Sequence, residues 1–268
     1  MTTTAAILDV PGAHLYHEVR GSGPLVVLVG APMDANPFTP LAELLAVDHT
    51  VVTTDPRGIN RSTVDDPDAD ATLDLRASDL AALIRHVDAG PAVVLGSSGG
   101  AVSTLALAQA YPDLVRVAIA HEPPLTEVLD DREELHRRTD DIIATHQGGD
   151  VLGAWRKFFV LANIDLPEPV FLQMFGGERT PQEIADDDFQ HNHMMRPTTR
   201  WQPDVAVLRS IATRIVIGIG AESGGQFCER TSIALGRLLD VEPTIFPGGH
   251  IGFAEQPEAF EKVFRSVL

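Results

Sequence analysis

Short runs of apolar, β-branched residues alternate with longer stretches of helical periodicity along most of this chain. Buried parallel strands have this composition, and a helix must carry the chain back before the next parallel strand can pair. The order therefore predicts an α/β fold with a mostly parallel sheet and helices on both faces. We expect strands at residues 5–8, 14–19, 25–29, 50–54, 92–95, 115–120, 214–219 and 241–246, and helices around 41–46, 75–87, 100–111, 228–239 and 257–267.

The alternation stops between residues 123 and 202, where apolar residues recur at helical spacing and no convincing strand is present. A chain of 268 residues can form one α/β domain that carries an insertion. We therefore expect a core formed by residues 1–122 and 203–268 and a helical lid formed by residues 123–202.

The sequence Gly-Ser-Ser-Gly-Gly at residues 96–100 lies directly between an expected strand and an expected helix. It matches the G-x-S-x-G pattern, in which a sharp strand-to-helix turn strains the central serine and exposes its hydroxyl. A glycine-rich turn before a helix can instead bind phosphate. However, the chain lacks the Gly-Lys-Ser/Thr ending of a P-loop and the G-x-G-x-x-G of a dinucleotide site. Ser98 is therefore predicted to be a nucleophile.

A serine hydroxyl is a weak nucleophile unless a base takes its proton. Among the ten histidines, His250 is the best candidate, because it follows the expected strand 241–246 across Pro-Gly-Gly. That position is a loop at the carboxyl end of the last strand, where open parallel sheets bind their ligands. We predict that His250 is the general base.

Two further segments complete a family pattern. Residues 55–62 read Asp-Pro-Arg-Gly-Ile-Asn-Arg-Ser, similar to a D-x-R-G-x-G-x-S turn with Asn60 in place of a glycine, and His250 is followed by Glu-Gln-Pro at 255–257. With the serine and histidine motifs, in this order, the chain resembles the α/β-hydrolase superfamily over nearly its whole length. The resemblance implies an α/β-hydrolase fold and serine-type hydrolysis without a cofactor.

The acid of the implied catalytic triad has two candidates. The family's usual carboxylate position corresponds here to Ser223, and Glu222 misses it by one residue. Glu122 instead follows the strand 115–120, a position similar to that of the acid in the zearalenone lactonases, and Tyr-Pro-Asp at 111–113 matches them too. Pro123 and Pro124 stiffen the chain beside Glu122, whereas Glu222 lies in a glycine-rich loop. We predict Glu122 as the acid and keep Glu222 as the alternative.

The oxyanion formed in ester cleavage needs two backbone N–H donors. One is expected from Gly99, directly after the nucleophile. The other is expected from the loop Gly-Ala-Pro-Met at residues 30–33, which is similar to the family's H-G-x-P. Pro32 has no N–H, so we predict Ala31 as the second donor.

The lid is rich in apolar side chains, and a lid above the serine would turn some of them toward the substrate. We expect Met33, Trp155, Phe159 and Met194 to line the pocket and an apolar ester or lactone to be the substrate. Carbon–carbon bond hydrolysis and acyl transfer would use the same residues, and a homologue that only binds its ligand is a further alternative. An epoxide or haloalkane hydrolase is disfavoured because the elbow residue is serine.

Composition restricts the partners. The formal net charge of -18 opposes binding to nucleic acid and to anionic membrane surfaces. The single cysteine, Cys228, excludes an internal disulfide, and no apolar run is long enough for a membrane helix. These features favour a cytoplasmic protein, and a homodimer is compatible with them.

A metal site is not expected. The three aspartates at residues 186–188, with His191 and His193, are interpreted as a solvated polar helix face followed by ordinary histidines, because no second ligand cluster accompanies them.

Overall fold

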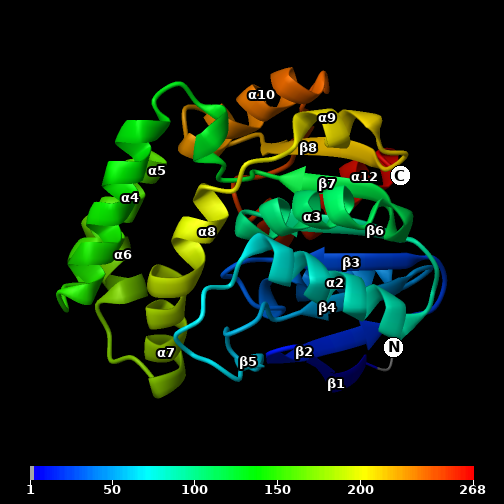
Figure 1. The fold of residues 1–268 in the computed structure, drawn as a ribbon, viewed down its shortest axis with the longest axis horizontal. Coiled ribbons are helices and arrows are strands. Elements are labelled where there is room, and N and C mark those ends of the chain that lie inside the picture. The colour runs from blue at the N-terminus through cyan, green and yellow to red at the C-terminus, as the bar shows by residue number, and fades with distance from the viewer. Residues whose placement is uncertain (1–2) are drawn as a thin grey trace.

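The computed structural model describes residues 3–268, and its described strands form one mixed sheet in the order β1-β2-β4-β3-β6-β7-β8-β9, with β5 beside β2 (Figure 1). The pairs from β4 to β9 are parallel, and the pairs that involve β2 are antiparallel. The mostly parallel α/β sheet expected from the sequence is therefore confirmed. The strands are β1 Thr3–Val10, β2 Ala13–Arg20, β3 Leu25–Val29, β4 Thr50–Thr54, β5 Thr63–Val64, β6 Ala92–Ser97, β7 Val115–His121, β8 Arg214–Gly220 and β9 Thr244–Phe246.

Helices cover the sheet on both faces because its central strands are buried on both sides. Along β3, Leu25, Val27 and Val29 belong to one core cluster, whereas Val26 and Leu28 belong to the other. This alternation is the two-residue period of a strand. The first cluster is completed by α2 (Leu73–Val87), α3 (Gly99–Ala110), α9 (Val205–Ser210) and α10 (Phe227–Leu239), and the second by α1 (Thr39–Leu45), α11 (Gly252–Glu255) and α12 (Pro257–Ser266).

Residues 123–202, which we call the lid segment, contain helices and no strand. Helices α4 to α7 stand together on one side of the sheet, at the left of Figure 1, and α8 lies between them and the core. The lid segment consists of η3 (Thr126–Val128), α4 (Arg132–Gln147), α5 (Val151–Ala162), α6 (Glu168–Phe175), α7 (Pro181–Phe189), the π-helix η4 (Gln190–Met194) and α8 (Met195–Thr199).

The structure differs from the expected elements mainly at their ends. Strand β9 begins only at Thr244, because Pro243 cannot donate to a strand ladder. The short strand β5 and the helices α9 and α11 were not expected, and neither were the 3-10 turns η1 (Asn36–Phe38) and η2 (Pro112–Leu114). Among residues 3–268, no helix combines the length and the apolar character that crossing a bilayer requires.

Candidate active site

The turn from β6 to α3 holds Ser98 in a conformation that few residues adopt, with φ 56° and ψ −127°. The strain persists because the surrounding backbone is packed too closely to relax. A Cβ at Gly96 would lie 2.2 Å from the carbonyl oxygen of Gly100, and one at Gly100 would lie 2.2 Å from that of Val29. The glycines of the motif are therefore required by close approach of the backbone, which places Ser98 at the start of α3.

Glu122 leaves the end of β7 with φ 55°, and its side chain is 0% exposed. Its Oε1 accepts a hydrogen bond of 2.8 Å from the Gly220 N–H, and its Oε2 lies 2.5 Å from Nδ1 of His250. Burial alone would raise the pKa of this carboxyl, but the hydrogen bond and positive charge of His250 outweigh it and lower the pKa to about 2. Glu122 is thus an ionised, rigidly held carboxylate beside the imidazole.

Glu222 lies elsewhere, in an exposed loop. Its Oε1 accepts from Nε2 of Gln256 at 3.2 Å, and no hydrogen bond to His250 is present in the described part of the chain. Ser223, which occupies the family's usual acid position, is completely buried. The structure therefore brings Glu122, and not Glu222, to the histidine.

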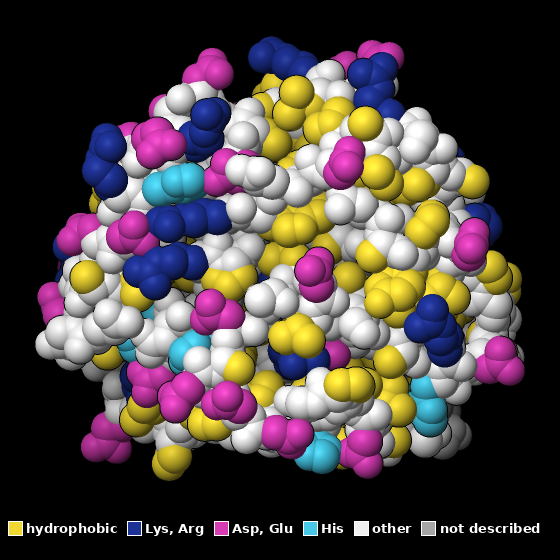
Figure 2. Space-filling view, in the orientation of Figure 1, with side chains coloured by type: hydrophobic (Ala, Val, Ile, Leu, Met, Phe, Trp, Pro, Cys, Tyr) yellow, Lys and Arg dark blue, Asp and Glu magenta, His cyan; other side chains and the backbone are white. Residues whose placement is uncertain are grey.

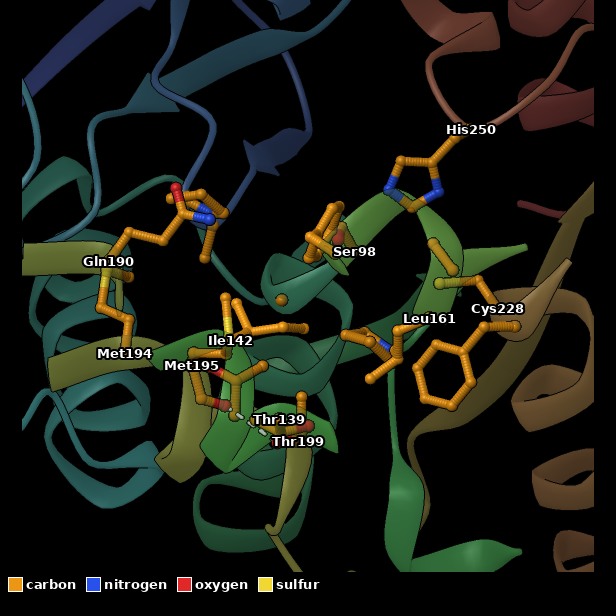
Figure 3. Close-up of a pocket in the computed structure, with 18 of the residues that line it drawn as sticks. Ser98, Thr139, Ile142, Leu161, Gln190, Met194, Met195, Thr199, Cys228 and His250 are labelled. Carbon is orange, nitrogen blue, oxygen red and sulfur yellow. Dashed lines mark hydrogen bonds between the residues drawn. The ribbon is translucent and has the colours of Figure 1, made fainter. Parts of the chain in front are cut away.

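Ser98 and His250 line the same cavity, which has a volume of about 130 Å³ and which we call the catalytic cavity. Figure 3 shows them facing this space, with Met194 on its far side. No hydrogen bond joins Ser98 to His250 among residues 3–268, but hydrogen bonds of this kind often tighten only when substrate binds. Because Nδ1 of His250 is engaged with Glu122, Nε2 is the ring nitrogen that remains without a partner on the residues that the structure describes.

The two expected oxyanion donors differ in availability. The Gly99 N–H donates to the carbonyl oxygen of Ala31 at 3.1 Å, so this donor is already occupied. The Ala31 N–H has no hydrogen-bond acceptor among the described residues. The two predicted donors are neighbours, but the Gly99 N–H would have to leave the Ala31 carbonyl oxygen before both could bind one oxyanion.

A buried guanidinium that the sequence did not single out lies behind this loop. Arg76 of α2 donates from Nη2 to the Gly99 carbonyl oxygen and from Nη1 to Oγ1 of Thr198 on α8, both at 2.6 Å. Burial lowers the pKa of Arg76 to about 10, so the group stays charged at neutral pH. Arg76 therefore connects the turn at residues 96–100 to the lid segment.

The wall of the catalytic cavity is almost entirely apolar, and His250 is its only titratable group besides Cys228 among the described lining residues. Burial raises the pKa of the Cys228 thiol well above its usual range, so the thiol is neutral at physiological pH. The lining comprises Ala31, Pro32, Ser98, Gly99, Pro124, Thr139, Ile142, Phe158, Leu161, Ala162, Ile164, Gln190, Met194, Met195, Thr198, Thr199, Gln226, Phe227, Cys228 and His250.

Of the four side chains expected in the pocket, only Met194 lines this cavity. Met33 and Trp155 line a neighbouring cavity, and Phe159 lines neither. Phe158 takes the place expected for Phe159, because consecutive helical residues point about 100° apart and the sequence does not reveal how α5 is rotated. Met33 and Trp155 therefore lie beside the catalytic cavity and not in its wall.

The expected solvated helix face at residues 186–188 is wrong for Asp187, which is buried. Asp187 and His191 are buried, and His191 stacks on His146 with ring centroids 4.2 Å apart and planes inclined by 6°. These three side chains are close enough to suggest a metal site. However, the lone pairs of a nitrogen ligand lie in the ring plane, so two parallel stacked rings do not direct them at one ion. We interpret the cluster as side-chain packing, in which Asp187 forms an ion pair with Arg179.

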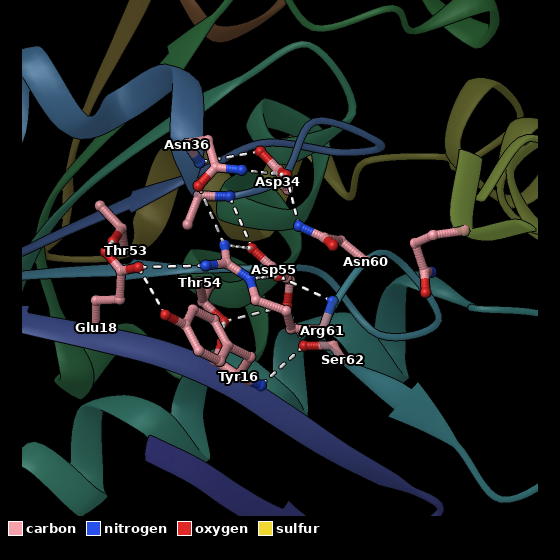
Figure 4. Close-up of polar contacts among 12 residues, drawn as sticks. Tyr16, Glu18, Asp34, Asn36, Thr53, Thr54, Asp55, Asn60, Arg61 and Ser62 are labelled. Atoms are coloured by element: carbon pink, nitrogen blue, oxygen red, sulfur yellow. Dashed lines mark hydrogen bonds and ion pairs between the residues drawn. The ribbon is translucent and has the colours of Figure 1, made fainter. Parts of the chain in front are cut away.

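The turn at residues 55–62 has a supporting role (Figure 4). Buried Asp55 accepts from Nε and Nη2 of Arg61 at 2.7 and 2.8 Å and from the Ala35 N–H at 2.8 Å. Asn60 adopts φ 52°, which explains why the family pattern has glycine here. The turn thus fixes the loop after β3, which carries Ala31.

A strained serine in a strand-to-helix turn, a histidine bonded to a buried carboxylate, and a helical segment beside a mostly parallel sheet are together typical of one class of fold. The family model for the alpha/beta hydrolase family matches residues 25–263, and the chain belongs to this family. Its relatives are hydrolases.

Two curated relatives are similar over nearly the whole chain. The chain is 30% identical to the uncharacterized hydrolase YraK of Bacillus subtilis (strain 168), over 100% of this chain and 97% of the relative. It is 26% identical to the zearalenone hydrolase of Bionectria ochroleuca, over 98% and 96%. Among solved structures, Est816, described as an N-acyl homoserine lactone degrading enzyme, has a TM-score of 0.75 at 18% identity and covers 98% of this chain and 100% of its own. At that identity the likeness shows the fold.

Proposed function

We propose that this protein hydrolyses a carboxylic ester or lactone of an apolar small molecule through an acyl-enzyme on Ser98. The observation that carries the proposal is the bond between the buried Glu122 carboxylate and Nδ1 of His250, in a cavity that His250 shares with Ser98. The apolar wall of that cavity favours a substrate whose acyl part is uncharged.

The reaction follows from the positions of these groups. Nε2 of His250 takes the proton from Ser98 while Oγ attacks the carbonyl carbon, and Glu122 stabilises the imidazolium that forms. The Ala31 N–H and the Gly99 N–H stabilise the oxyanion, which requires the Gly99 N–H to exchange the Ala31 carbonyl for the substrate oxygen. The imidazolium then protonates the leaving alcohol. Water, activated by His250, hydrolyses the acyl-enzyme and releases the acid.

Labelling with a fluorophosphonate tests the nucleophile, and the neighbouring serine provides a matched control. Wild type and Ser97→Ala should be labelled, whereas Ser98→Ala should not be labelled and should lose on the order of 10⁴ to 10⁶ in turnover. Ser97 is buried and does not line the cavity, so its removal tests for a general effect on the turn. Labelling of Ser98→Ala would refute the assignment.

A panel of esters, lactones and carbon–carbon substrates then tests the reaction class. Release of acid and alcohol in repeated turnovers supports the proposal. Three outcomes would refute the proposal. Faster cleavage of a carbon–carbon bond would indicate a carbon–carbon hydrolase, and transfer of the acyl group to an added alcohol in place of water would indicate an acyltransferase. Labelling without turnover would indicate a homologue that only binds its ligand.

A further inference from the structure

A second cavity of about 510 Å³ adjoins the catalytic cavity. We call it the outer cavity, and it is the more open of the two. Pro32 and Gln190 line both spaces. An ester whose acyl part fills the smaller, apolar catalytic cavity must direct its alcohol part outward, and the outer cavity adjoins it directly.

The outer cavity carries an excess of negative charge. Its described lining includes the five carboxylates of Asp34, Glu178, Glu183, Asp186 and Asp187 but only one basic group. In Figure 2, acidic side chains gather over α7, at the lower left.

The single cation does not neutralise this excess, because Arg179 is already paired with Asp187 at 2.7 Å. Among residues 3–268, Asp186 accepts from two neutral donors, the Asn60 N–H and the Gln182 amide, both at 2.8 Å. The remaining carboxylates therefore favour a positively charged guest and oppose an anionic one.

Aromatic rings form another part of the outer wall. Trp155 stacks on Phe175 with ring centroids 4.7 Å apart, and Nε1 of Trp155 donates to Oδ2 of Asp187 at 3.2 Å. The negative faces of such rings attract organic cations, and they favour weakly hydrated ones over metal ions.

Gln190 supplies an independent sign of a ligand at the junction of the two cavities. Its side chain is only 9% exposed and lines both cavities, and none of the hydrogen bonds among residues 3–268 involves its amide group. An amide that lines a cavity and has no protein partner is suited to a polar group of a bound molecule. Gln190 is the first residue of the π-helix η4, a type of helix that is often found at functional sites.

We propose that the outer cavity binds the alcohol part of the substrate and that this part carries a positive charge, as a quaternary ammonium alcohol does. The Gln190 amide would then bond to a polar atom near the ester linkage. This inference rests on the proposed ester hydrolysis and adds the class of leaving group.

A pair of esters that differ only in charge tests the inference. Butyrylcholine and 3,3-dimethylbutyl butyrate have the same acyl group and almost the same shape, but the second has a neutral carbon in place of the ammonium nitrogen. We expect kcat/KM to be about ten-fold higher for the choline ester at low salt, and the preference to shrink toward one as ionic strength rises to about 0.5 M.

Charge-neutralising variants locate the effect. The combined change Asp186→Asn and Glu178→Gln should lower kcat/KM several-fold more for the choline ester than for the neutral ester, so that the choline preference shrinks. The control Glu258→Gln removes an exposed carboxylate on α12 and should change neither rate. Equal rates on the two wild-type esters, or a preference that survives the double variant, would overturn the inference.

A binding measurement that needs no turnover separates this inference from the proposed function. Tetramethylammonium should bind the wild type saturably in calorimetry and bind the double variant several-fold more weakly. If Ser98 is labelled and the neutral ester is cleaved but no cation preference exists, only the present inference fails. If tetramethylammonium binds but no ester is cleaved, the proposed function fails and the cation site stands.

Discussion

Replacing Glu122 with glutamine should cripple hydrolysis while the protein still folds. Glutamine has the same shape and can still accept from the Gly220 N–H through its oxygen. It then presents an NH₂ group to His250, which disfavours the tautomer that leaves Nε2 free to act as a base.

The size of the loss follows from the interaction between the carboxylate and the imidazolium. Lowering the Glu122 pKa from 4.5 to about 2 corresponds to roughly 3 kcal/mol. Loss of that stabilisation alone reduces the rate about 10²-fold, and the wrong tautomer extends the loss toward 10⁴-fold. We therefore expect kcat/KM of Glu122→Gln to fall by between about 10² and 10⁴.

The assay is hydrolysis of p-nitrophenyl butyrate between pH 6 and 9, with circular dichroism and thermal unfolding to check the fold. Glu222→Gln is the matched control, because Glu222 is exposed and its side chain bonds to Gln256 and not to His250 in the described part of the chain. It should stay within a factor of about three of wild type. Near-native activity of Glu122→Gln, or a crippled Glu222→Gln, would refute the assignment of the acid.

Three further predictions concern stability and specificity. Because the folded-state pKa of Glu122 is lowered, the wild type should lose stability relative to Glu122→Gln as pH falls from about 4.5 to 2. If the difference in free energy of urea unfolding between the two proteins does not change over this pH range, the prediction is wrong. Gly100→Ala should lower the free energy of unfolding by about 1–3 kcal/mol or more, since its Cβ would lie 2.2 Å from the Val29 carbonyl oxygen. The control Gly177→Ala places its Cβ more than 4 Å from any neighbouring atom and should leave that free energy almost unchanged. Met194→Leu should change relative rates across a series of acyl chain lengths by a few-fold; an equal effect from Phe159→Leu would argue against the described cavity.

The backbone features on which structure and sequence agree are those that depend on local geometry. The glycines of the turn at residues 96–100 and the prolines after Glu122 restrict the chain within a few residues, so the sequence alone indicates their effect. The mostly parallel character of the sheet follows from the same kind of pattern, because buried parallel strands must be apolar along their length.

The errors concern side chains whose surroundings come from distant parts of the chain. Phe158 and Phe159 are equally apolar, and only the rotation of α5 against its neighbours decides which of them faces the serine. In the same way, Asp187 and His191 are polar residues in a polar stretch, but the π-helix η4 changes the helical phase and brings His191 against His146. Arg76 belongs to no motif, so its bonds to Gly99 and Thr198 had no sequence signal.

The hydrogen bonds of Arg76 to Gly99 and Thr198 restrict how the lid segment can move. Separating α8 from the core would leave a buried guanidinium without one of its acceptors, which is costly in a site closed to water. Helix α8 should therefore remain docked while substrate enters, and the opening should occur in the part of the lid segment before it, where much of α6 is exposed. Amide hydrogen exchange should then be slow in α8 and fast in α6, and Arg76→Met should speed exchange in α8 and around Gly99 together.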